Sequence, residues 1–107
     1  MSEGKSLVSN AFQTFLSEAP EQARAWGALV QSLGQASALE AKTGALAYLA
    51  VLAALERLSG IPFHVQAAKQ VGATREEVIS AVLVGLPAAG HVVTQALPLA
   101  VEAYDAE

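Results

Sequence analysis

Four side chains in this sequence are of types that could act on a small molecule: His64, Arg57, His91 and Tyr48. His64 comes two residues after Pro62, which suits the first turn of a helix because it has no backbone N–H to leave unpaired there. The unpaired N–H groups and the dipole at a helix start disfavour a charged imidazole. A neutral His64 could therefore act as a general base or donate a hydrogen bond to a developing enolate. The alternative is a histidine that only caps or packs at a helix junction.

Arg57 is the candidate for binding an acidic substrate. Its guanidinium could hold a carboxylate through two parallel hydrogen bonds. A cation in the last turn of a helix is favourable in any case, and Glu56 or Glu40 could pair with it. The residue types leave both a substrate-binding role and a structural role open.

His91 and Tyr48 are the remaining polar candidates. His91 follows the Pro87–Gly90 break and is expected at the start of another helix. The two histidines have no short ligand spacing and no nearby carboxylate cluster, so no metal site is expected. His91 is then either a second polar group lining a pocket or a surface residue. Tyr48 lies in an apolar stretch, where a buried hydroxyl needs a partner, which could be a ligand, a backbone group or water.

The pattern of apolar residues and helix breakers predicts an all-α chain without strands. Six helices with short connections are expected over residues 6–18, 20–33, 39–58, 62–71, 75–86 and 91–104. Pro20 suits a helix start, and Gly72 suits a left-handed helix end. Thr74 and Glu77 have the spacing of a capping box. Pro98 is expected to kink the last helix, since it removes a backbone hydrogen bond.

The third helix is expected to organise the fold. Its middle, Gly44–Leu55, is apolar on every face, which is typical of a helix that is covered all round. Its many alanines permit close approach by neighbouring helices, including helices of another subunit.

The length of 107 residues fits a single domain, 1–107. Hydrophobic residues make up 53% of the chain and charged residues only 15%, against a usual ~25%. A domain of this size keeps a large surface, and so few charges cannot cover it. We therefore expect a homo-oligomer formed through an apolar face.

Several classes of function are disfavoured by composition. A net charge of −4 with only six Lys and Arg gives no basic footprint for nucleic acid. With no cysteine, disulfides and thiol chemistry are impossible. The first residues lead into an amphipathic stretch, so we expect no secretion signal. The uncharged run Thr43–Leu55 is shorter than the ~20 residues of a membrane span, and a soluble cytoplasmic protein is expected.

Three segments carry a family resemblance: Lys42-Thr43 opening a long apolar helix, Phe63–Ala68, and Gly72–Val78 at a fixed distance after it. With these, the region 39–90 resembles the carboxymuconolactone decarboxylase family, which includes the alkyl hydroperoxidase D-like proteins. The resemblance implies an orthogonal helical bundle that assembles as a homotrimer or homohexamer. It implies no cofactor.

The resemblance also shows what this chain lacks. The family's peroxidase branch uses a Cys-x-x-Cys pair, then a histidine after three further residues, with an upstream glutamate in a proton relay. The cysteine positions correspond to Arg57 and Gly60, the glutamate to Ala45, and only the histidine is kept, as His64. Without a thiolate, thiol peroxidase activity is excluded. The decarboxylase branch also lacks the cysteine pair, and the resemblance places Arg57 near His64.

Two functions from different classes follow. The first is a cofactor-free lyase or related enzyme acting on a small organic acid or lactone, with His64 as acid or base and Arg57, His91 and Tyr48 binding the substrate. The second is a non-catalytic oligomeric binding or scaffold protein that kept the fold after losing the redox centre. The sequence leaves the choice between them open.

Overall fold

The computed structural model describes residues 7–107, which are helices joined by short connections and contain no strand. The predicted all-α class is confirmed, with six α-helices of nine residues or more in the described chain. The chain divides into two compact units, Met1–Glu40 and Ala41–Glu107. Each unit is described by itself. None of the described helices is long and apolar enough to cross a membrane.

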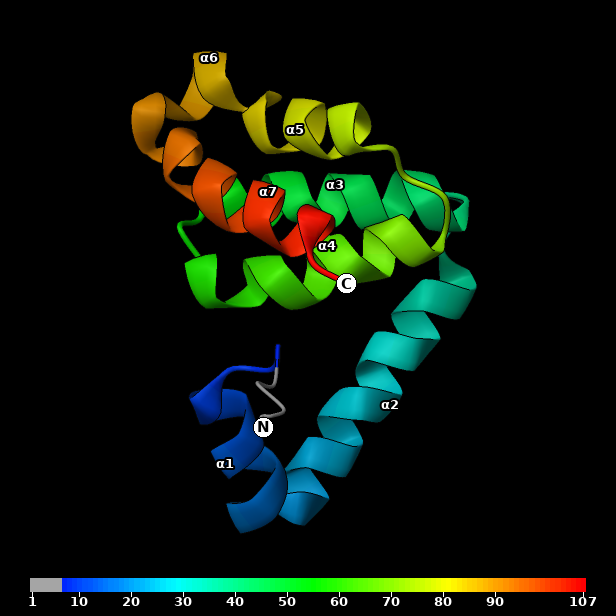
Figure 1. The fold of residues 1–107 in the computed structure, drawn as a ribbon. Coiled ribbons are helices and arrows are strands. Elements are labelled where there is room, and N and C mark those ends of the chain that lie inside the picture. Colours follow the sequence, from blue (N-terminus) through cyan, green and yellow to red (C-terminus); the bar gives the residue numbers. More distant parts are fainter. Residues whose placement is uncertain (1–6) are drawn as a thin grey trace. The chain divides into compact units, whose positions relative to one another are not determined.

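The first unit is a helical hairpin of α1 (Asn10–Glu18) and α2 (Pro20–Ala36) (Figure 1). Pro20 opens α2, as its sequence position predicts. The Trp26 ring packs edge-on against Phe12 of α1, with ring centroids 5.3 Å apart. The predicted start of the first helix at Ser6 lies outside the described residues, and α2 continues past Gly34 to Ala36.

The C-terminal half of α2 presents an apolar stripe to solvent. Leu29 and Val30 each lie about one turn before Leu33 on the same side of the helix, and all three are about half exposed. Within the hairpin, the aromatic rings of α1, Phe12 and Phe15, contact α2 at Trp26, in the first half of that helix.

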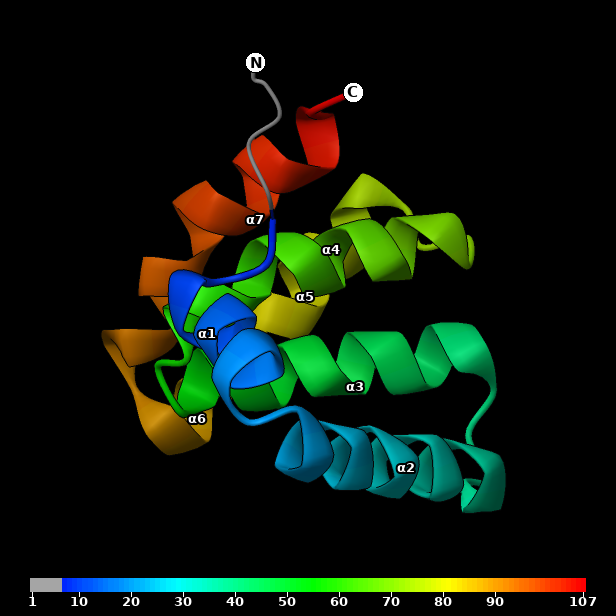
Figure 2. The same ribbon diagram turned by 90° about the horizontal axis from the view of Figure 1, so that it is seen from below.

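The second unit holds the remaining elements. They are α3 (Ala41–Ala54), η1 (Leu58–Gly60), α4 (Ile61–Gln70), α5 (Arg75–Leu83), α6 (Leu86–Ala89), η2 (His91–Gln95) and α7 (Ala96–Asp105), where η marks a 3₁₀ helix. Helix α3 packs against α4 and α5, and α7 packs against the same two helices. Figure 2 shows α4 and α5 lying between α7 and α3.

The core of this unit is built from small and branched apolar side chains of all four packed helices. Its largest fully buried members are Leu49, Ile61, Val65, Val78, Val82 and Val93. Alanines such as Ala53, Ala68 and Ala100 are also fully buried and allow the helix axes to approach closely. No charged or polar residue is buried in the described chain.

Helix α3 differs from its prediction in length and in coverage. It spans Ala41–Ala54 rather than 39–58, because the chain turns at Glu56, whose φ of 59° is left-handed. Only Leu49, Leu52 and Ala53 are buried, while Tyr48, Val51 and Leu55 are about half exposed. The prediction of a helix covered on all faces is therefore wrong for the single chain, and an apolar face remains uncovered.

Helix ends in the second unit follow local chemistry. The Thr74 hydroxyl accepts the Glu77 N–H at 3.0 Å, and the Glu77 carboxylate accepts the Thr74 N–H at 2.9 Å, so the predicted capping box is present. Gly72 has a φ of 100° and ends α4 in the predicted left-handed conformation. Pro98 does not kink a helix, because α7 begins only at Ala96 and Pro98 lies in its first turn, where no hydrogen bond is lost.

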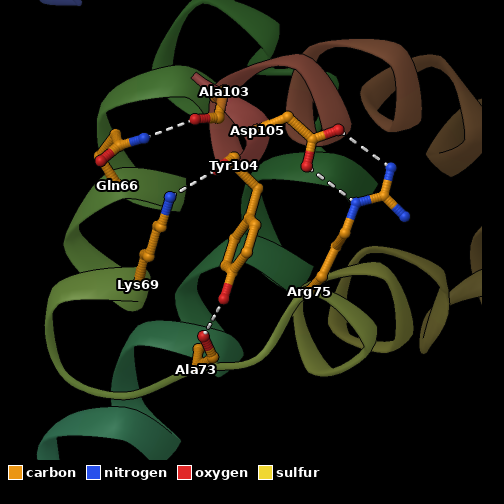
Figure 3. A network of polar contacts seen from close by, with 7 residues as sticks. All are labelled: Gln66, Lys69, Ala73, Arg75, Ala103, Tyr104 and Asp105. Carbon is orange, nitrogen blue, oxygen red and sulfur yellow. Dashed lines mark hydrogen bonds and ion pairs between the residues drawn. The ribbon is translucent and has the colours of Figure 1, made fainter. Parts of the chain in front are cut away.

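A polar network fixes the C-terminal end of α7 (Figure 3). Gln66 and Lys69 of α4 donate to the Ala103 and Tyr104 carbonyls in the last turn of α7, which have no partner within the helix. The Tyr104 hydroxyl donates to the Ala73 carbonyl at 2.8 Å. Arg75 at the start of α5 holds Asp105 through two hydrogen bonds of 2.9 and 3.1 Å. These contacts join α4, α5 and α7 around one helix end.

Candidate functional site

His64 lies in the first turn of α4, where the sequence predicted it, and its side chain is partly buried. The imidazole packs against the Tyr48 ring of α3, with centroids 4.6 Å apart and planes tilted by 50°. The Phe63 ring meets it at 5.1 Å and 72°, close to an edge-to-face arrangement. The structure thus brings together two of the four predicted site residues, His64 and Tyr48, and adds Phe63.

The imidazole nitrogens of His64 make no polar contact in the described structure. Within residues 7–107 neither nitrogen has a hydrogen-bond or ion-pair partner. Burial lowers the pKa of His64 below its usual value of 6.5. The neutral imidazole, with one N–H donor and one acceptor nitrogen, is therefore the favoured form at neutral pH.

Arg57 is exposed at the residue before η1. Its backbone N–H donates to the Leu52 carbonyl at 2.9 Å, and its carbonyl accepts the Gly60 N–H at 3.2 Å. In the described part of the chain its guanidinium makes no hydrogen bond or ion pair, so neither expected structural pairing, with Glu56 or with Glu40, is formed. No hydrogen bond or ring contact joins it to His64, yet η1 is the only element between the two residues.

His91 is exposed at the first position of η2. Its backbone carbonyl accepts a 2.7 Å hydrogen bond from the Thr94 hydroxyl. This contact lies within the turn and does not involve the imidazole. Among the described residues, no polar or ring contact joins His91 to His64, Tyr48 or Arg57. No group of three or more potential metal ligands is present in residues 7–107.

Gly60 and Phe63 also lie beside His64. Neither residue was among the four side chains predicted from sequence to form the site. A methyl group added at Gly60 would lie 3.9 Å from the His64 Cδ2 atom and 3.5 Å from the Leu52 side chain. Gly60 therefore lies directly beside the imidazole. Phe63 directly precedes His64 in sequence, but nothing in the sequence indicated that its ring contacts the imidazole. The Phe63 side chain is 46% exposed.

A shallow groove of about 800 Å³ lies between α3 and α5, and none of the four predicted site residues lines it. Small and apolar side chains line most of it, including Ala47, Ala50 and Ala81. At one end Lys42 holds Glu77 at 3.1 Å. His64 and Arg57 do not line this groove.

The model of the carboxymuconolactone decarboxylase family matches residues 20–102, which is most of the chain. The chain belongs to the carboxymuconolactone decarboxylase family. No curated protein and no solved structure shows significant similarity to it. The matched range covers α2 and nearly all of the second unit, so it includes every predicted site residue.

Membership in the carboxymuconolactone decarboxylase family allows the residues around His64 to be compared with those of the family's peroxidase branch. The resemblance places Arg57 and Gly60 at the positions of the peroxidase branch's cysteine pair. Arg57 directly precedes η1, Gly60 is the last residue of η1, and Gly60 lies beside the imidazole. Ala45, which the resemblance places at the position of the relay glutamate, lies on α3 and packs against the hydrophobic core. Since the chain contains no cysteine, it cannot carry out the thiol chemistry of that branch.

Proposed function

We propose that this protein is a cofactor-free lyase or related enzyme of the carboxymuconolactone decarboxylase family that acts on a small organic acid or lactone. His64 is the acid or base, and Arg57 binds the substrate carboxylate. Tyr48 contacts the bound substrate, and His91 is a second polar group at the margin of the site.

The observation that carries this proposal is the state of His64. Its imidazole is partly buried between two aromatic rings, has a lowered pKa, and keeps both nitrogens without partners in the described chain. A histidine with a structural role usually satisfies at least one nitrogen with a carbonyl or carboxylate. An imidazole that is held in place but unpaired suits a group that receives a ligand.

The proposed reaction follows from this chemistry. When the bond between the carboxyl carbon and the substrate breaks, CO₂ leaves and the electron pair remains on the substrate as a dienolate. The N–H of the neutral His64 imidazole donates a hydrogen bond to that charge. The imidazole then passes a proton to the substrate carbon while its other nitrogen takes one from water, so it ends the cycle neutral. Arg57, whose guanidinium has no partner among residues 7–107, holds a second carboxylate or the lactone oxygen and so fixes the substrate beside the imidazole.

We further propose that the functional form is a homo-oligomer, a trimer or hexamer, in which residues 1–107 act as one domain. Exposed apolar side chains on both units support this assembly, among them Leu33 on α2 and Val51 on α3. Coverage of the exposed α3 face would also exclude water from the surroundings of His64, which strengthens electrostatic interactions there. The family match supports a single domain because it spans both units.

A second candidate function is a non-catalytic oligomeric binding or scaffold protein. It is favoured by Ala45 and Gly60, which bring no reactive group to two positions of the peroxidase site. It is also favoured by the groove between α3 and α5, which lies apart from His64. In this account the exposed apolar face serves only assembly.

Thermal stability in the presence of small carboxylic acids and lactones, including carboxymuconolactone, tests the proposal. A ligand that binds only the native protein raises its melting temperature according to RT ln(1 + [L]/Kd), so millimolar ligand detects weak binding. We expect at least one compound to stabilise the wild type and the His91→Ala variant more than His64→Ala. Equal stabilisation of wild type and His64→Ala by every binding compound would refute the role of His64.

A further inference from the structure

The orientation of His64 is unusual for a functional histidine. Such residues are commonly oriented by a hydrogen bond from one ring nitrogen to a carboxylate or carbonyl, which also fixes the tautomer. His64 has no such bond within the described chain. The contacts of its ring with neighbouring side chains are instead made by its carbon atoms and its faces.

Aromatic contacts from two helices supply that restraint. Tyr48 approaches from α3 at 4.6 Å and Phe63 from α4 at 5.1 Å, at different angles to the imidazole plane. The Cδ2 edge faces Gly60, where an added methyl would lie 3.9 Å away. The imidazole is thus bounded by two rings and by the η1 turn.

The backbone that carries the Tyr48 ring is itself fixed. Its neighbour Leu49 is fully buried, and Leu52, one turn later, is 8% exposed and packs next to Gly60. Helices α3 and α4 pack side by side, so the Tyr48 and His64 backbones keep their separation (Figure 2). The Tyr48 ring can then restrain the imidazole without a hydrogen bond.

The charged side chains Lys69, Asp105 and Arg57 do not orient the His64 ring. Among residues 7–107, Tyr48 is the only titratable side chain in ring contact with His64. Lys69, on the same helix, is directed to the Tyr104 carbonyl of α7, and Asp105 of α7 binds Arg75 of α5. Arg57 makes no polar contact with the imidazole.

We propose that Tyr48 and Phe63 are positioning residues that orient the His64 imidazole by ring packing, so that both of its nitrogens face the ligand and the ligand selects the tautomer. This inference rests on the proposed function in one respect: it takes the ligand of His64 to be the proposed substrate. The packing itself holds in the free protein and can be tested there.

The test compares Tyr48→Leu, which removes the ring, with Tyr48→Phe, which keeps the ring and removes only the hydroxyl. The readout is the NMR spectrum of the histidine ring protons in the full chain without ligand. His64→Gln assigns the His64 signals, and His91 serves as an internal reference for folding. Because Tyr48 is 46% exposed, both variants are expected to fold.

We expect Tyr48→Leu to move the His64 ring-proton signals, since a neighbouring aromatic ring shifts them, while the His91 signals stay in place. Tyr48→Phe should leave both sets near their wild-type positions. Any compound that stabilises the wild type should bind about two- to tenfold more weakly to Tyr48→Leu, the range of a single aromatic pair. Phe63→Leu gives a second, independent variant with the same expectation.

Unchanged His64 signals in folded Tyr48→Leu and Phe63→Leu would overturn the inference. A Tyr48→Phe spectrum that matches Tyr48→Leu would also overturn it, because the hydroxyl and not the ring would then be responsible. These spectra need no ligand, so they separate this inference from the proposed function. If ligand binding depends on His64 but the His64 ring signals do not change in Tyr48→Leu, the proposed function is supported and the positioning role is refuted.

Discussion

Thr74 and Glu77 satisfy each other's backbone N–H groups at the start of α5, at 3.0 and 2.9 Å. The same Glu77 carboxylate receives Lys42 of α3 at 3.1 Å. One short segment therefore caps α5 and joins it to α3. The hydrogen bond from the Thr74 backbone N–H, followed by the one from Lys42, lowers the pKa of Glu77, so the carboxylate stays charged over the neutral range.

Loss of the Thr74 cap should destabilise the protein measurably. We expect Thr74→Ala to lower the free energy of unfolding by about 1 kcal/mol, because the Glu77 N–H loses its acceptor. Thr74→Ser keeps a hydroxyl and should remain within a few tenths of a kcal/mol of the wild type. Urea denaturation at neutral pH measures both. Equal stabilities of the alanine and serine variants would contradict the capping role.

Glu56 should be a site of removable strain. It adopts a left-handed backbone conformation at the end of α3, where residues with a side chain are disfavoured and glycine is not. Glu56→Gly is expected to raise the free energy of unfolding by about 0.5–1 kcal/mol. Glu56→Ala removes the same charge but keeps a Cβ atom, so it should give no such gain. A destabilised glycine variant would speak against the strain argument.

The stability of the protein should depend on the charge of His64. Burial lowers its pKa in the folded state, so between that value and 6.5 the unfolded chain binds more protons than the native chain. The free energy of unfolding should therefore decline as pH falls below about 6.5. The decline should be smaller in His64→Gln, which does not titrate. Parallel profiles for the two proteins from pH 7.5 to 5.5 would show that His64 is not perturbed.

Assembly should depend on the exposed face of α3. We expect light scattering to give the wild type a mass that is a multiple of its 11.0 kDa chain. Val51→Glu places a charge on a half-exposed apolar position and should reduce that mass. Gln70→Glu introduces the same charge at an exposed polar position of α4 and serves as the control. A wild type of 11.0 kDa would contradict the proposed oligomer.

Local chemistry made some of this structure predictable from sequence. The Thr74 cap, the Gly72 turn and the Pro20 helix start each depend on a few neighbouring residues, and each is present. The Pro98 kink was wrong because its effect depends on where α7 begins, and the preceding 3₁₀ turn at His91–Gln95 has no distinct sequence signal.

The contacts of the candidate site were harder to predict. Helix α3 is apolar on every side, so no stripe indicated that Tyr48 would face α4 rather than α5. The Tyr48–His64 contact arises from the packing of two helices, and the Arg75–Asp105 pair joins residues 30 positions apart. His64 itself was found by its residue type, its place at a helix start and the family resemblance.

His64, in the function proposed above, takes part in a reaction on a small organic acid or lactone. The most direct test of this role is the rate of CO₂ release from carboxymuconolactone, and from each compound that stabilises the wild type, by wild type, His64→Ala and His91→Ala. We predict turnover by the wild type, a smaller loss for His91→Ala at the margin of the proposed site, and a loss of about 100-fold or more for His64→Ala. A His64→Ala variant that turns over the same compound as fast as the wild type would contradict the account.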